Sequence, residues 1–240
     1  MRGRRRSVHS SGASILSLSV LVSAVLLAGA LLPISMATAS DVGQEITIAQ
    51  LKYRGGGDWY ANPTALPNLL AELRKRTDLR IAASPATVSP GDDDIFLHPI
   101  TYVTGHGRIR LSEEDVSNLR TYFERGGFMW VDDNYGLDPY FRAEIAKVLP
   151  GSPLVELPFD HDIYHSFYDF PEGLPKIHEH DGGPPHGYGI HLDGRMVVFY
   201  SFNTDIGDGM EEVEVHNDPP EKHEAALRMG MNVIVYALTH

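Results

Sequence analysis

The sequence predicts an α/β fold: a single three-layer domain with a mainly parallel sheet flanked by helices, followed by a C-terminal hairpin and helix. Short β-branched and aromatic runs alternate with segments of helical apolar spacing, which is typical of right-handed β–α–β units. The 240 residues are 42% hydrophobic and 22% charged, as in an ordinary globular domain. The chain has no cysteine, which excludes disulfides, thiolate metal sites and a cysteine nucleophile.

The first half of the domain predicts strands that alternate with helices. In chain order we expect a strand at 45–53, a glycine-rich loop at 54–58, a helix at 63–76, a strand at 79–83, a loop at 84–94, a strand at 95–103 and a helix at 112–125. Leucines at helical spacing, such as Leu66 and Leu70, mark the first helix. Pro99 suggests a break inside the third strand. Ser112 caps the second helix, and Gly126 ends it.

The second half predicts one more strand–helix unit and then a hairpin. We expect a strand at 128–131, a helix at 138–148, a long loop at 152–187, hairpin strands at 188–192 and 195–202, an acidic loop at 205–220 and a helix at 221–238. Asp193-Gly194 is a strong turn signal for the hairpin. Aromatic residues in the long loop, such as Phe159 and Tyr164, indicate that it is ordered.

Residues 1–39 differ from the remainder and predict a signal peptide or an N-terminal anchor. A basic start at 2–6 precedes an apolar run at 15–32, and Ala37-Thr38-Ala39 has the small-x-small pattern of a cleavage site. An uncleaved run of this length could span a bilayer. Both alternatives place residues 40–240 outside the cytoplasm, either periplasmic or secreted, or anchored to the membrane by residues 15–32.

The charge of the chain argues against nucleic acid as a partner. The net charge is −12, and residues 1–39 hold four arginines and no acidic residue, so 16 basic and 32 acidic residues remain, a net of −16. Such a charge keeps a protein soluble and repels anionic polymers and membranes. It favours cationic ligands or bound metal ions, although most acidic proteins are simply soluble.

Three polar segments, 54–58, 105–107 and 132–134, follow predicted strands directly. Ligands of open α/β sheets bind beyond the carboxyl ends of the strands, so we expect these segments on one rim. The candidate ligand-binding residues are Arg54, Asp58, Trp59, Tyr60, His106, Asn134, Tyr135 and Tyr168. The catalytic candidates are His106, Asp132, Asp133 and His165. The plainer alternatives are a glycine-rich turn at 54–58 and a helix cap at the paired aspartates.

The long loop also carries candidate metal ligands. These are His161, His165, His178, His180 and Asp181. Nitrogen and oxygen ligands without thiolates suit zinc or a harder divalent ion. The spacing matches no HExxH motif, and hydrogen bonds within the loop are the alternative interpretation.

Several short motifs together resemble domain-of-unknown-function family 4159. They are TGHG at 104–107, GGF at 126–128, DD at 132–133, HDIYHSFY at 161–168 and HDGGPP at 180–185. The likeness covers about residues 46–239 and implies a class I glutamine amidotransferase-like, flavodoxin-like architecture in an exported or membrane-associated bacterial protein, with no established reaction. In that architecture the turn at 132–136 takes the place of the nucleophile turn. Asn134 stands there and cannot act as a nucleophile.

Three functional hypotheses follow. The first is a module that binds a small polar or carbohydrate-like ligand, or a protein segment, at the rim. The second is a hydrolase in which Asp133 or His106 activates water, with or without a divalent metal ion. The third is a scaffold in an envelope complex, whose rim motifs brace the long loop. The expected partners are thus a small polar ligand or an envelope protein, and the cofactor stays open.

Overall fold

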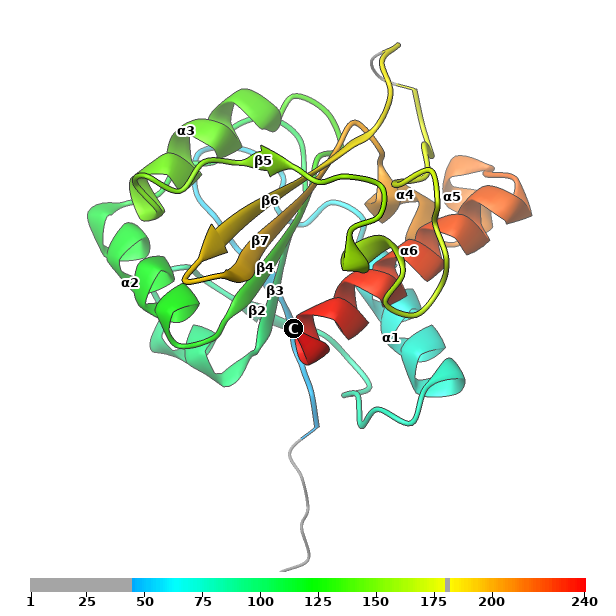
Figure 1. Ribbon diagram of the computed structural model, residues 1–240, viewed down its shortest axis with the longest axis horizontal. Helices are drawn as coiled ribbons and strands as arrows, with labels where there is room; N and C mark the ends of the chain where they lie inside the picture. The colour runs from blue at the N-terminus through cyan, green and yellow to red at the C-terminus, as the bar shows by residue number, and fades with distance from the viewer. Residues whose placement is uncertain (1–44, 180–181) are drawn as a thin grey trace, which may run out of the picture. The chain divides into compact units, whose positions relative to one another are not determined.

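A seven-stranded sheet in the order β2-β1-β3-β4-β7-β6-β5 forms the centre of the domain (Figure 1). The computed structural model describes residues 45–179 and 182–240. The strands are β1 Ile48–Leu51, β2 Ala86–Val88, β3 Ile100–Val103, β4 Phe128–Asp132, β5 Val155–Glu156, β6 His186–Leu192 and β7 Arg195–Phe202. In this spatial order β2, β1, β3, β4 and β7 are parallel to their neighbours, whereas β6 pairs antiparallel with both β7 and β5. The predicted α/β class and C-terminal hairpin are confirmed.

Helices cover both faces of this sheet. The longer ones are α1 Ala65–Arg76, α2 Glu113–Glu124, α3 Asp138–Val148 and α6 Pro220–Thr239, and the shorter ones are α4 Ile206–Met210, α5 Val213–His216 and the 3-10 turns η1 Asp93–Leu97 and η2 Asp162–Tyr164. α1, α4 and α6 lie on one face, and α2 and α3 lie on the other (Figure 1). Each face of the sheet has its own apolar core. Trp130 of β4 packs into the core that contains residues of α1, α4 and α6, and Val131 packs into the core that contains residues of α2 and α3, so successive residues of one strand serve both layers.

The predicted helices form for the reasons that the sequence gives. Leu66, Leu69, Leu70 and Leu73 of α1 are all buried against the sheet. Burying each such side chain stabilises the fold by about 1.5–3 kcal/mol. At the start of α2 the Ser112 side chain accepts a hydrogen bond from the N–H of Asp115, whose carboxylate accepts one from the N–H of Ser112. This reciprocal cap satisfies two otherwise unpaired donors.

Two strand predictions near the edge of the sheet need correction. The strand predicted at 79–83 is wrong: only Ile81 makes a bridge, to Ile46. Instead 86–88, inside the predicted loop, pairs with β1 as β2. The strand predicted at 95–103 begins only at Ile100, because Pro99 has no N–H to offer the ladder and the residues before it form η1.

The segments predicted as loops contain short elements. The region 152–187 holds β5 and η2, and its residues Ile163, Tyr164 and Ile177 are buried, so the expected order is confirmed. The region predicted as an acidic loop at 205–220 forms α4 and α5. Residues of η2 and α4 pack into the same core as α6, and β5 forms by pairing with β6; local patterning encodes neither contact.

The leader or anchor predicted for residues 1–39 lies outside the described residues. Within 45–179 and 182–240, no helix combines the length and the apolar character needed to cross a bilayer.

Candidate functional site

The loops after β1, β3 and β4 meet at the carboxyl edge of the sheet, as the sequence predicts. Asp58, after β1, accepts hydrogen bonds from the main-chain N–H of His106 and from its ring, with 3.0 Å between Nδ1 and Oδ2. The main chain of His106, after β3, forms a parallel bridge with that of Tyr135, after β4. We call Asp58, His106 and Tyr135 the rim cluster.

Gly105 allows this close approach. Its φ is +125°, and a Cβ there would lie 2.5 Å from the hydroxyl of Tyr53 and 2.7 Å from the carbonyl of Asp58. A side chain at this position would therefore clash with groups on the preceding loop and would also strain the backbone. The TGHG motif thus sets the distance between the loop after β1 and the loop after β3.

The electrostatics of Asp58 and His106 favour an ionised Asp58 carboxylate beside a His106 ring that is held in one orientation. Partial burial raises the pKa of Asp58, but hydrogen bonds from the main chain and ring of His106 outweigh burial and hold the pKa below its usual value. The His106 side chain is 47% exposed and that of Asp58 is 35% exposed. Among the described residues, none bonds the Nε2 atom of His106. That nitrogen is therefore accessible to a ligand.

Asp132 and Asp133 point to opposite faces of the sheet. Asp132 is fully buried, and its two oxygens accept hydrogen bonds from the Ser201 hydroxyl and the Gly207 N–H, each at 2.6 Å. Burial raises the pKa of Asp132 to about 7. The oxygens of Asp133 accept from the N–H of Leu137 and the hydroxyl of Tyr200. Asp133 therefore holds Leu137, the residue before α3, whereas no side chain in the described part of the chain caps α3 itself.

Asn134 connects the rim cluster to the loop after β7. Its side-chain oxygen accepts from the Thr104 hydroxyl at 2.8 Å, while its amide donates to Asn62 at 3.0 Å and to Asp208 at 2.9 Å. The side chain is buried and has all its polar atoms engaged, so it fixes the turn in place. β3, β4 and β7 are neighbours, which places the ends of β3 and β7 about 10 Å apart.

The family follows from the comparison of this sequence with known proteins. Residues 47–238 match the model described as Domain of unknown function (DUF4159). The chain belongs to this family. Its description names no activity, and a comparison with curated proteins gives no match. The function of this DUF4159 domain must therefore be argued from its site.

The other predicted ligand-binding residues of the DUF4159 domain divide into two groups. Trp59 and Tyr60 follow Asp58 and contact each other edge to face, with Tyr60 64% exposed. Arg54 has an exposed side chain, and its main chain pairs with Arg110. Tyr168, by contrast, lies away from the rim.

The position of Tyr168 has a clear cause. Asn232 of α6 bonds both main-chain groups of Tyr168, and the Tyr168 hydroxyl accepts from Arg76, the last residue of α1. Because α1 starts at the carboxyl edge of the sheet and runs away from it, Arg76 marks the opposite edge. The long loop thus carries Tyr168 to the wrong end of the domain for a rim ligand.

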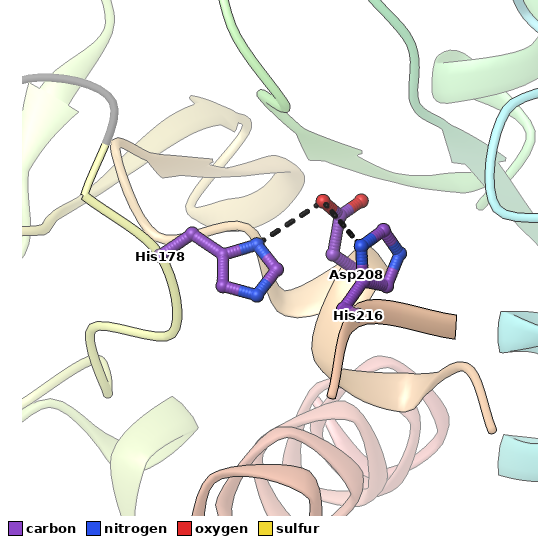
Figure 2. A group of neighbouring side chains, drawn as sticks. All are labelled: His178, Asp208 and His216. Atoms are coloured by element: carbon purple, nitrogen blue, oxygen red, sulfur yellow. Dashed lines mark hydrogen bonds and ion pairs between the residues drawn. The ribbon is translucent and has the colours of Figure 1, made fainter. Parts of the chain in front are cut away.

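The predicted metal ligands of the DUF4159 domain are also separated. The ring Nδ1 of His161 accepts from the N–H of Ile163 and caps η2. His165 bonds Asp169 at 2.5 Å and the carbonyl of Phe159 at 2.9 Å. Of the predicted ligands that the structure describes, His178 alone reaches the carboxyl edge, where it lies beside Asp208 and His216 (Figure 2). His180 and Asp181 lie outside the described residues.

Asp208 and His216 were not among the predicted ligands. They belong to the region predicted as a loop, and the spacing from 178 to 208 to 216 matches no local metal motif. The signal that the sequence does offer is the density of acidic residues and histidine between 205 and 218.

Proposed function

We propose that this DUF4159 domain binds a small, hydroxyl-rich ligand of the carbohydrate kind at the carboxyl rim of its sheet, outside the cytoplasm. The observation that carries the proposal is the rim cluster: Asp58 holds His106 by two hydrogen bonds, the main chain of the exposed Tyr135 bridges to that of His106, and the exposed Tyr60 follows Asp58 by two residues. The predicted leader at 1–39 supports the location.

The protonation of the pair follows from its geometry. A carboxylate can only accept hydrogen bonds, so the His106 Nδ1 that faces Asp58 carries the hydrogen. In the neutral ring Nε2 then presents a lone pair toward solvent. A ligand hydroxyl can donate to this nitrogen, and other hydroxyls can donate to carboxylate oxygens nearby.

The flanking surface supports a sugar rather than an anion or an apolar molecule. Tyr135 is 53% exposed and Tyr60 is 64% exposed, which offers flat faces to the C–H side of a sugar ring. The excess of acidic residues over the domain disfavours anionic ligands. A few polar groups beside aromatic side chains are typical of small-molecule sites.

Calorimetric titration of the full-length protein with malto-, cello- and chito-oligosaccharides tests the proposal. We expect at least one series to bind, and Tyr135→Ala and His106→Ala each to weaken binding by at least about tenfold, or ~1.4 kcal/mol. Phe167→Ala is the matched control, because Phe167 is also an exposed aromatic residue and contacts Tyr168 edge to face, away from the rim. Binding that survives both rim substitutions, or no binding to any series, would contradict the proposal.

A second candidate function is hydrolysis, and the orientation of His106 favours it. A carboxylate-held imidazole with an accessible Nε2 is the arrangement of a general base for water. Release of reducing ends from the same oligosaccharides would reveal it, and His106→Ala should then lower the rate by about 10²–10⁴-fold. Binding without product release leaves the binding function alone. With neither, the scaffold interpretation is favoured, in which the rim loops only brace the long segment.

The resemblance to the glutamine amidotransferase-like architecture adds one constraint to this proposal. The strand order and the tight turn after β4 support it, and in that architecture Asn134 of this turn would take the place of a nucleophile. The proposal therefore includes no acyl transfer to this turn.

A further inference from the structure

A second group of side chains converges next to the rim cluster, at the end of β7. His178 comes from the long segment before β6, Asp208 from α4 and His216 from the end of α5 (Figure 2). The Nδ1 atoms of His178 and His216 lie 3.2 Å and 3.9 Å from the same oxygen of Asp208, Oδ2. One ligand atom from each residue lies within 4.8 Å of the others.

The outer nitrogens of both rings face further carboxylates. Nε2 of His178 lies 3.0 Å from Asp218 Oδ1, and Nε2 of His216 lies 2.8 Å from Glu211 Oε2. Carboxylates only accept hydrogen bonds, so both nitrogens of each ring face acceptors, whereas a neutral imidazole has one hydrogen for its two nitrogens. When that hydrogen serves the outer carboxylate, the Nδ1 lone pairs of both rings face Asp208. Either a cation held among the three groups or a second proton on each ring relieves this contact between acceptors.

The distances fit a transition-metal ion. Zinc bonds of about 2.1 Å to nitrogen and oxygen in a tetrahedral site place neighbouring ligand atoms about 3.4 Å apart. The two measured separations from Asp208 Oδ2, 3.2 and 3.9 Å, lie on either side of that value. Small side-chain shifts would bring both rings to bonding distance.

The surroundings match the outer shell of a metal centre. Metal-bound histidines usually donate their second nitrogen to a carboxylate, which orients the ring and raises its basicity. Asp218 and Glu211 do this here, and both are buried. The second oxygen of Asp208 accepts from Asn134, which orients the third ligand.

We propose that His178, Asp208 and His216 bind a divalent transition-metal ion, of which zinc is the best fit, with Asp218 and Glu211 as positioning residues. Three protein ligands leave a coordination position for water or a ligand group, as in catalytic rather than structural zinc sites. Asp205 also borders this group, with its Oδ2 3.8 Å from Nδ1 of His178. This site is separate from the sugar-binding rim cluster, although Asn134 connects the two.

The competing explanation for the contact of both Nδ1 atoms with Asp208 is one additional proton on each ring. Doubly protonated imidazoles would form ion pairs with Asp208 and need no metal. The two explanations differ in whether the purified protein takes up an ion with defined stoichiometry near neutral pH.

The test is metal uptake by the full-length protein, purified without a histidine tag and stripped with a chelator. Titration with Zn²⁺ should give one tight equivalent, and Co²⁺ in its place should give the visible absorption of a four-coordinate ion. The paired substitution of His178 and His216 by alanine should abolish that equivalent. His165→Ala is the matched control, since its ring bonds Asp169 outside the cluster.

A graded variant protects the test against misfolding. Glu211→Gln keeps the three ligands and changes only an outer-shell partner, so it should keep the stoichiometry and weaken Zn²⁺ affinity by about 10–100-fold. His106→Ala should leave Zn²⁺ uptake unchanged. Folded protein that takes up no Zn²⁺, or uptake that the paired histidine variant retains, would overturn the proposal and favour the protonated cluster.

Discussion

Replacing Asp132 by asparagine should stabilise the apo protein at alkaline pH. Asp132 is completely buried at the end of β4, and burial raises its pKa to about 7, above the value of about 3.9 in an unfolded chain. A raised pKa in the folded state means that the protonated carboxyl stabilises the fold below pH 4. This contribution is lost as the pH rises through 7.

The size of the effect follows from the shift. Each pKa unit corresponds to about 1.36 kcal/mol, so the raised pKa lowers the free energy of unfolding by up to about 4 kcal/mol at pH 8. At pH 5, where only the unfolded chain ionises this carboxyl, the loss is about 1–2 kcal/mol. Asparagine removes this cost and keeps the local hydrogen bonds. Its oxygen can accept from the N–H of Gly207, and its amide can donate to Ser201, which frees the single hydroxyl hydrogen of Ser201 to donate to the carbonyl of Val131.

Urea unfolding of both proteins at pH 5 and pH 8, with a chelator present, measures the difference. The advantage of Asp132→Asn should be about 3 kcal/mol larger at pH 8 than at pH 5. Asp193→Asn is the control, because Asp193 lies exposed in the hairpin turn in a left-handed conformation that asparagine tolerates. Equal advantages at the two pH values, or a less stable variant at pH 8, would refute the reasoning.

Three further substitutions test the fold and the rim. Leu70→Ala removes a fully buried side chain of α1 and should lower the free energy of unfolding by about 2–5 kcal/mol in urea. Ser112→Ala removes the cap of α2 and should cost about 1 kcal/mol, whereas Ser117→Ala within the same helix should have a much smaller effect. Gly105→Ala places a Cβ against Tyr53 and Asp58, so it should lower the melting temperature and abolish oligosaccharide binding; retained binding would contradict the described rim.

The sequence predicts the layers of this fold well where local periodicity and burial agree. The leucines of α1 and the capping residue of α2 have the spacing that their buried and capped positions need. The apolar run of β4 predicts a central strand, and β4 is buried on both faces. The rim is predictable for the same reason, since parallel strands deliver their following loops to one edge.

The remaining features depend on contacts between distant segments. The position of β2 at 86–88 rather than 79–83 is decided by its pairing with β1, which no local pattern records. The meeting of His178 with His216 requires the long segment to return across α4, so separation along the chain gives no clue to it. Tyr168 shows the converse case, in which a motif residue is held elsewhere by Asn232.

The buried amide of Asn134 connects the two ends of the carboxyl edge by hydrogen bonds. One of its hydrogens goes to Asp208, and its oxygen is held by Thr104, two residues before His106. An ion bound to Asp208, as proposed above, would therefore also restrain the turn that carries Tyr135. Linkage then requires that the proposed ion and the proposed saccharide change each other's affinity by the same factor. Asn134→Ala should make the affinity for the ion independent of the affinity for the saccharide.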